Sequence, residues 1–116
     1  MATIDQWPME QDALIAAPKH HTLLYENEFV RVIDANIPAG ETTALHTHQF
    51  PASHYFLSWS DFIRYDGEGN VLADSRSMDL KPAAGTAVWS GPLALHSLSN
   101  IGNNSLHVIS VEIKNK

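Results

Sequence analysis

Short runs of β-branched and aromatic residues, separated by glycine and proline, fill the chain from Leu23 to Ile113. Such runs are typical of β-strands bounded by turns. The pattern predicts strands over residues 29–37, 42–48, 54–59, 62–65, 71–73, 86–90 and 106–113, with a further short run at 77–80. The Gly- and Asn-rich stretch 66–70 predicts a hairpin, because these residues accept positive φ. No convincing helical period follows Leu23, so we expect an all-β antiparallel sandwich or barrel.

Residues 1–22 lack a sustained hydrophobic period, and we interpret them as an N-terminal arm with a short helical turn over residues 9–16. Residues 23–116 then form a single domain, since a chain of 116 residues is too short for two domains of ordinary size.

Composition narrows the possible functions. Seven Lys and Arg residues and a formal net charge of -6 argue against a nucleic-acid partner. The absence of cysteine excludes disulfides and thiolate metal ligands. We see neither a basic, apolar leader nor a run long enough to span a bilayer, so we expect a cytoplasmic protein without a membrane partner.

Histidine is the outlier of the composition, with seven residues of 116. His46 and His48 are separated by one residue in a predicted strand, so their side chains point to the same face, ~7 Å apart along the strand. Two such imidazoles can share a metal ion with one more ligand from a neighbouring strand. Taken alone, the pair is also compatible with two exposed polar positions.

Two spacings give this pair a context. Gly40 is followed after five residues by His46 and then by His48, and Gly85 is followed after ten residues by His96 and after three more by Asn100. The order and spacing resemble the two motifs of the cupin superfamily. The resemblance, from about Leu23 to Ile113, implies a small single-domain cupin with an antiparallel double-stranded β-helix (jelly-roll) barrel. In cupins the residue matching Asn100 ties a turn rather than contacting substrate.

The chain departs from the first cupin motif at the position of its usual glutamate ligand, which falls on Ala52 or Ser53. The resemblance therefore implies a metal site of His46, His48 and His96, with open positions for water, substrate or dioxygen. His54 is an additional candidate: a bulge near Pro51 would turn it inward as a fourth ligand, whereas regular alternation would turn it outward.

The other candidates concern the pocket and the remaining histidines. Arg64 could pair with a substrate carboxylate, or lie outward in solvent, and Tyr55 and Trp89 could line a pocket or belong to the core. We interpret His20 and His21 as surface residues of the arm, and His107 as a packed or edge residue.

Three-His sites occur in cupin-type Fe(II) dioxygenases, so the resemblance implies a mononuclear iron enzyme acting on a small chelating metabolite. No catalytic residue beyond the metal ligands stands out. Zinc, nickel or manganese could replace iron. Zinc- or nickel-dependent hydrolysis, isomerisation or lyase chemistry, and non-catalytic ligand binding, remain alternatives. Small cupins are commonly homodimers, and we expect one here.

Overall fold

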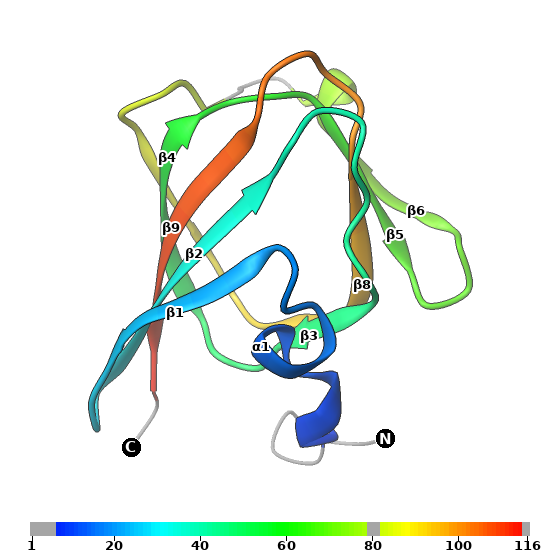
Figure 1. The fold of residues 1–116 in the computed structure, drawn as a ribbon. Coiled ribbons are helices and arrows are strands. Elements are labelled where there is room, and N and C mark those ends of the chain that lie inside the picture. Colours follow the sequence, from blue (N-terminus) through cyan, green and yellow to red (C-terminus); the bar gives the residue numbers. More distant parts are fainter. Residues whose placement is uncertain (1–6, 79–81, 115–116) are drawn as a thin grey trace.

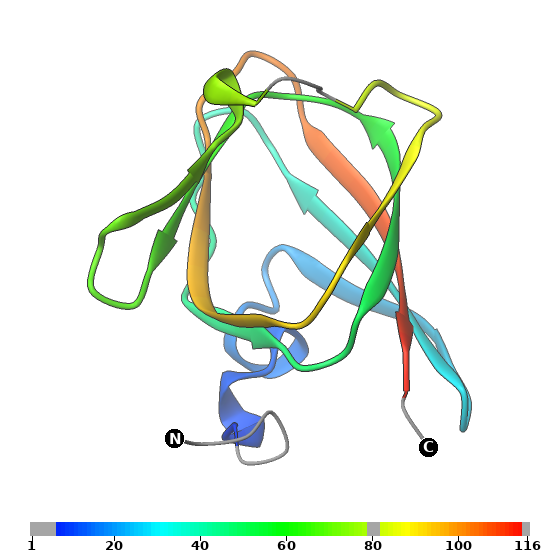
Figure 2. The same ribbon diagram turned by 180° about the vertical axis from the view of Figure 1, so that it is seen from behind.

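Two antiparallel sheets face each other in the computed structural model, which describes residues 7–78 and 82–114 and places nine strands in them (Figures 1 and 2). The first sheet runs in the order β1 (His21–Glu26), β2 (Val30–Ile37), β9 (Leu106–Ile113), β4 (Ala52–Ser58) and β7 (Ala87–Ser90). The second runs β3 (His46–His48), β8 (Leu93–Asn100), β5 (Phe62–Asp66) and β6 (Val71–Asp74). The prediction of an antiparallel all-β fold is thus confirmed.

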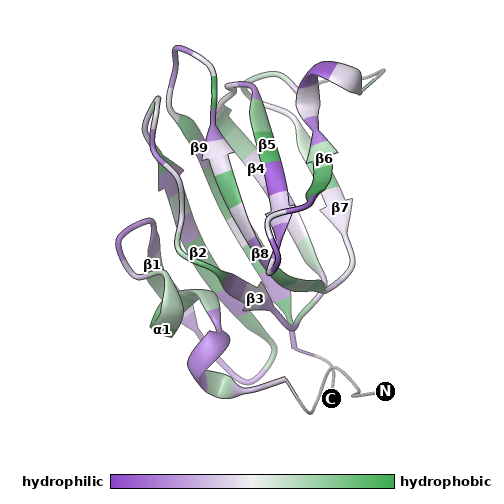
Figure 3. Ribbon diagram, turned by 90° about the vertical axis from the view of Figure 1, so that its right-hand side faces the viewer, coloured by the Kyte–Doolittle hydropathy of each residue, from purple (hydrophilic) through white to green (hydrophobic). Residues whose placement is uncertain are grey.

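Strand β9 lies in the middle of the first sheet, between β2 and β4. Its buried positions alternate along the strand, as expected when one face of a sheet covers a core. The inward row begins with the apolar Leu106 and Val108 and continues with the polar Ser110 and Glu112. One end of the space between the sheets is therefore apolar, and the other end is polar. Figure 3 shows hydrophobic and hydrophilic residues mixed along the strands, together with a hydrophilic β3.

The apolar end holds the hydrophobic core. Phe56, Phe62, Leu106 and Val108 are buried together, and Trp59 and Leu98 pack against them. The Trp59 ring contacts Phe56 and Phe62 edge-on, with centroids 5.5 and 5.7 Å away. Such edge-to-face contacts are favourable for aromatic rings.

The turns at Gly40 and Gly85, the first glycines of the two motifs, both have a positive φ, as glycine allows. Gly40 has φ 82°, a value that side chains rarely tolerate. Asn100 is buried and holds the loop after β8: its amide donates to the carbonyls of Ile37 and Asn104, and its Oδ1 accepts from Ser60 and Gly102. This is the turn-tying role that the resemblance implies for Asn100.

The segment before β1 folds onto the sheets. A 3-10 turn (Met9–Gln11) and the short helix α1 (Ala13–Ala16) occupy the region where a helical turn was predicted. Asp12 caps α1 by accepting from the Leu14 amide, and it bridges to Thr47 of β3. The side chain of Asp12 is buried, so this segment is packed against the barrel rather than solvated.

Four elements differ from the sequence prediction. Strand β1 was not predicted, and its first two residues belong to the expected N-terminal arm. Strand β8 was not predicted, because its small and polar residues follow a Gly91-Pro92 break and lack a clear apolar alternation. The strand expected over 42–48 is reduced to His46–His48. Ser75–Ser77 forms a 3-10 turn, and most of the run expected at 77–80 lies outside the described residues.

Candidate metal centre

Four histidines from three strands meet at the polar end of the cavity. His46 and His48 come from β3, and strand pairing places His96 of β8 directly opposite His46. The ring centroids of His46 and His96 are 4.4 Å apart, and those of His46 and His48 are 4.8 Å apart. His21, at the start of β1, completes the group with its centroid 4.7 Å from that of His46. The sequence motifs predict three of these four residues.

Each of the four imidazoles has its Nδ1 beside an acceptor. In His21, His46 and His96 the acceptors are the carbonyl oxygens of Ala17, Ala44 and Ala94, at 2.9, 2.7 and 2.7 Å. In His48 the acceptor is Oε2 of Glu112, at 3.3 Å. Because a carbonyl oxygen can only accept, Nδ1 carries the proton and Nε2 keeps its lone pair. This is how proteins commonly orient histidines that bind metals.

Three of the four histidines are close enough together to share a metal ion, and the predicted ligand His96 is not in that set of three. One nitrogen from each of His21, His46 and His48 can be chosen so that all three lie within 4.8 Å of one another. Imidazole is a good ligand for divalent zinc, iron, copper and nickel, so the donor set fits a single transition-metal ion.

The environment keeps these rings neutral. Burial lowers the pKa of His46 to about 2, with His48 and His96 adding like-charge repulsion. Burial also lowers the pKa of His96 to about 4, and it lowers the pKa values of His21 and His48. Only neutral imidazole can donate a lone pair to a metal, so the site is ready to bind at neutral pH.

A buried chain of charges lies behind His48. The Arg31 guanidinium donates to Oε1 of Glu112 at 2.9 and 2.7 Å and to the Asp12 carboxylate at 2.9 and 3.3 Å. All three side chains are buried. Burial raises the pKa of Glu112, although Arg31 opposes this effect. Glu112 is opposite Ala52 in the β4–β9 pairing, so a carboxylate approaches the site from β9, next to the strand where cupins usually supply one.

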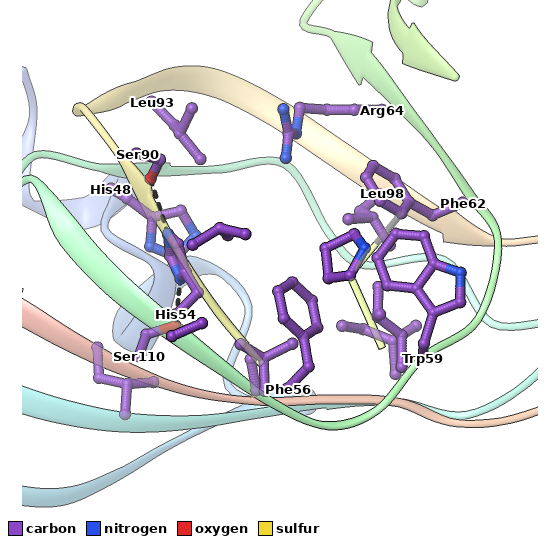
Figure 4. Close-up of a pocket in the computed structure, with 18 of the residues that line it drawn as sticks. His48, His54, Phe56, Trp59, Phe62, Arg64, Ser90, Leu93, Leu98 and Ser110 are labelled. Atoms are coloured by element: carbon purple, nitrogen blue, oxygen red, sulfur yellow. Dashed lines mark hydrogen bonds between the residues drawn. The ribbon is translucent and has the colours of Figure 1, made fainter. Parts of the chain in front are cut away.

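His54 faces the cavity, because it is paired with the inward residue Ser110 across β4 and β9. Its two ring nitrogens are each 2.7 Å from a serine hydroxyl, of Ser110 and of Ser90 (Figure 4). Of the two orientations considered for His54, the structure shows the inward one. To serve as a fourth ligand, His54 would have to give up one of these hydrogen bonds.

The histidines open into a cavity of about 640 Å³. Arg64 and Trp89 are among the residues that line it. Arg64 points inward, whereas Trp89 is largely exposed, as expected for a residue at the rim. Tyr55 alternates with His54 and Phe56 along β4 and is 45% exposed, which places it on the outer face of the sheet. Tyr55 is not among the residues that line this cavity.

Sequence reasoning missed two residues of the site, His21 and Glu112. His20 and His21 were expected at the surface, yet both are buried: His20 lies 2.8 Å from Glu41, and His21 joins the metal group. No periodicity in the arm signals this. Glu112 was detectable, because alternation in the last strand places it on the same face as Leu106 and Val108.

The architecture is that of the cupin double-stranded β-helix. A cupin domain from Bordetella pertussis Tohama I superposes with a TM-score of 0.65 at 20% identity, covering 82% of this chain and 92% of that one. An RmlC-like cupin from Methanocaldococcus jannaschii gives 0.56 at 14% identity, over 80% and 77% of the two chains. A protein from Klebsiella pneumoniae with a double-stranded β-helix domain gives 0.55 at 17% identity, over 97% and 83%. These likenesses establish the fold and leave the activity to the site.

Two other comparisons found nothing: no family model matches the sequence, and no curated protein matches it. Within residues 7–78 and 82–114, none of the helices has the length and apolar character needed to traverse a bilayer.

Proposed function

We propose that the chain binds one divalent metal ion through His46, His48 and His96, with His21 as a further ligand, and that the preferred ion is iron rather than zinc, nickel or manganese. The observation that carries this proposal is the shared orientation of the four rings, each with its Nδ1 beside an acceptor. Such a set leaves four Nε2 lone pairs for a metal. A merely structural cluster of neutral histidines has no need of this uniform arrangement.

We further propose that the protein is a dioxygenase-type oxidoreductase acting on a small chelating metabolite. Iron held by neutral imidazoles would keep its +2 charge, favour anionic chelating ligands and support reaction with dioxygen. The chain itself supplies a cavity with an apolar end next to the histidines, and the hydroxyls of Ser90 and Ser110 hold His54 in place. No carboxylate needs to leave its present partner for this site to form, because Glu112 stays with Arg31.

Elemental analysis tests the metal site. Protein prepared without a histidine tag from iron-supplemented cells should carry close to one metal ion per chain, and His46→Ala should carry almost none. His107→Ala is the matched control, since His107 is a strand histidine whose Nε2 instead pairs with Asp34 at 2.9 Å. His21→Ala should weaken metal retention during dialysis, because it removes one of the four nitrogens.

Wild-type protein that stays metal-free after expression with iron, zinc, nickel or manganese would contradict the metal site. If the metal is present, oxygen consumption with a panel of diketones, thiols and 2-oxo acids tests the activity. Iron without oxygen uptake favours the alternative of a non-catalytic binding protein, and zinc or nickel favours hydrolase, isomerase or lyase chemistry.

We also propose a cytoplasmic homodimer. Strand β1 is at the edge of its sheet and exposes Leu23, Leu24 and Tyr25, with Phe29 beside it. Apolar edge strands of this kind are usually covered by a partner. Light scattering should give twice the chain mass of 12.8 kDa, and Leu24→Lys should shift the protein toward monomer. A wild-type monomer at micromolar concentration would contradict the proposal.

A further inference from the structure

Arg64 is an uncompensated cation inside the cavity. It lies in the middle of β5, opposite Leu98 of β8, and its guanidinium extends from β5 into the cavity, on the side toward His48 and His54 (Figure 4). Within the described part of the chain it makes no ion pair and no hydrogen bond, and its buried Nε has no partner. Arg31 and Arg76, in contrast, each pair with carboxylates.

Arg64 is half-buried, and its buried Nε without an acceptor is unfavourable, because this atom loses hydration and gains no hydrogen bond in return. Arg64 stays charged at neutral pH. Its Cζ lies over the face of the Phe62 ring, 5.6 Å from the ring centroid. An anion seated between Arg64 and the histidines would supply the missing acceptor.

The rest of the cavity lining is mostly apolar, with Ser90, Ser110 and Glu112 near the histidines and Thr43 and Thr86 as its other polar residues. Trp59, Phe62 and Leu98 lie on the side of the cavity away from His48 and His54, and Phe56 lies between them and His54 (Figure 4). Their rings form a wall of edge-to-face contacts, of the kind that receives a flat apolar group. The cavity thus combines one cation, a metal-binding end and an aromatic end.

We propose that Arg64 binds the carboxylate of a small monocarboxylic acid whose apolar, aryl-sized body fills the end of the cavity formed by Phe56, Trp59 and Phe62. This inference rests on the proposed function in one respect: the same carboxylate, with a neighbouring oxygen such as that of a 2-oxo acid, would be the chelating group beside the metal site. The site of Arg64 itself exists without the metal.

The chemistry of the cavity favours this ligand class over other anions. The planar guanidinium fork matches a carboxylate in two parallel hydrogen bonds. A phosphate ester or a polyanion would need more than this single pocket cation, in a chain whose net charge is -6. A sugar acid would place hydroxyls against aromatic walls that offer few acceptors. A volume of about 640 Å³ is within the range of ordinary small-ligand pockets.

Binding to protein stripped of metal with EDTA tests the inference, with 3-phenylpropionate, its uncharged amide and acetate as probes. Calorimetry or tryptophan fluorescence should show that 3-phenylpropionate binds tightest. Arg64→Met should weaken its binding roughly ten- to a hundredfold, because a charge-assisted hydrogen bond is lost. The same variant should leave amide binding within about twofold. Arg76→Met, at an exposed arginine paired with Asp74, is the matched control.

Equal binding of the acid and its amide to wild-type protein would overturn the inference, as would no detectable binding of the acid. This comparison needs no variant, so it holds even if Arg64→Met fails to fold. Acetate binding as tightly as 3-phenylpropionate would overturn the aromatic part. Metal-loaded protein should prefer phenylpyruvate to 3-phenylpropionate. Failure of metal loading alone would contradict the proposed function and leave the Arg64 result standing.

Discussion

Replacing Arg31 by methionine is expected to lower the free energy of unfolding by about 3–5 kcal/mol, since it leaves two buried carboxylates without their cation. Arg31 holds Glu112 and Asp12 together, and the Glu112 side chain is only 1% exposed. Urea denaturation of the metal-free protein measures the loss. The loss should be larger at pH 8 than at pH 6, because Glu112 can relieve the repulsion by taking up a proton.

Two further variants serve as controls for this experiment. Arg76→Met removes an exposed pair with Asp74 and should cost less than about 1 kcal/mol. Adding Glu112→Gln to Arg31→Met should recover part of the stability, because the double variant no longer has an unpaired carboxylate at position 112. A loss below about 1 kcal/mol for Arg31→Met would show that the buried chain of charges contributes little to the fold.

Acidification is expected to destabilise the metal-free protein from about pH 6.5 downward. The folded-state pKa values of His46 and His96, about 2 and about 4, lie below the ordinary histidine value of 6.5. Between these values the unfolded chain takes up protons that the folded chain does not, so stability falls as pH falls. The two residues together should cost about 3 kcal/mol between pH 6.5 and pH 5.

Urea midpoints at pH 7 and pH 5, in the presence of EDTA, measure this effect. His21 and His48, whose pKa values are also lowered, add to the loss of stability as the pH falls. Glu112, whose pKa is raised, opposes that loss. His96→Gln removes one titrating group and should reduce the fall by about 1.5 kcal/mol. Stability that is level from pH 7 to pH 5 would mean that these rings are not held neutral.

The sequence predicts most of the barrel because the physical signals are local. The β-branched run of β2 and the Gly69 turn, with φ 85°, are both explicit in the residues. The short strand β3 could not be bounded correctly, since its ends depend on pairing with β8 and a shift in register between His46 and His48. Strand β8 itself is held by its neighbours β3 and β5 rather than by its own alternation.

The candidate site was predictable only where the ligands follow a spacing. His46, His48 and His96 stand in motifs, and the structure brings them within ring contact of one another. The participation of His21 depends on how the arm folds back, a tertiary event that no period in residues 1–22 records. The orientation of His54 was undecided for a related reason: one residue of slip reverses every side chain of a strand.

The position of His21 has a consequence for comparing proteins of this fold. The segment from Asp12 to His21, which leads into β1, supplies an imidazole, the Ala17 carbonyl that orients it, and, in Asp12, one of the two carboxylates paired with Arg31. An alignment restricted to the core strands from Leu23 onward would discard all three and would score the site as a bare three-histidine cluster. Relatives that keep the histidine spacing of β3 and β8 but differ at the positions of Asp12, Ala17 and His21 are therefore expected to differ in metal preference.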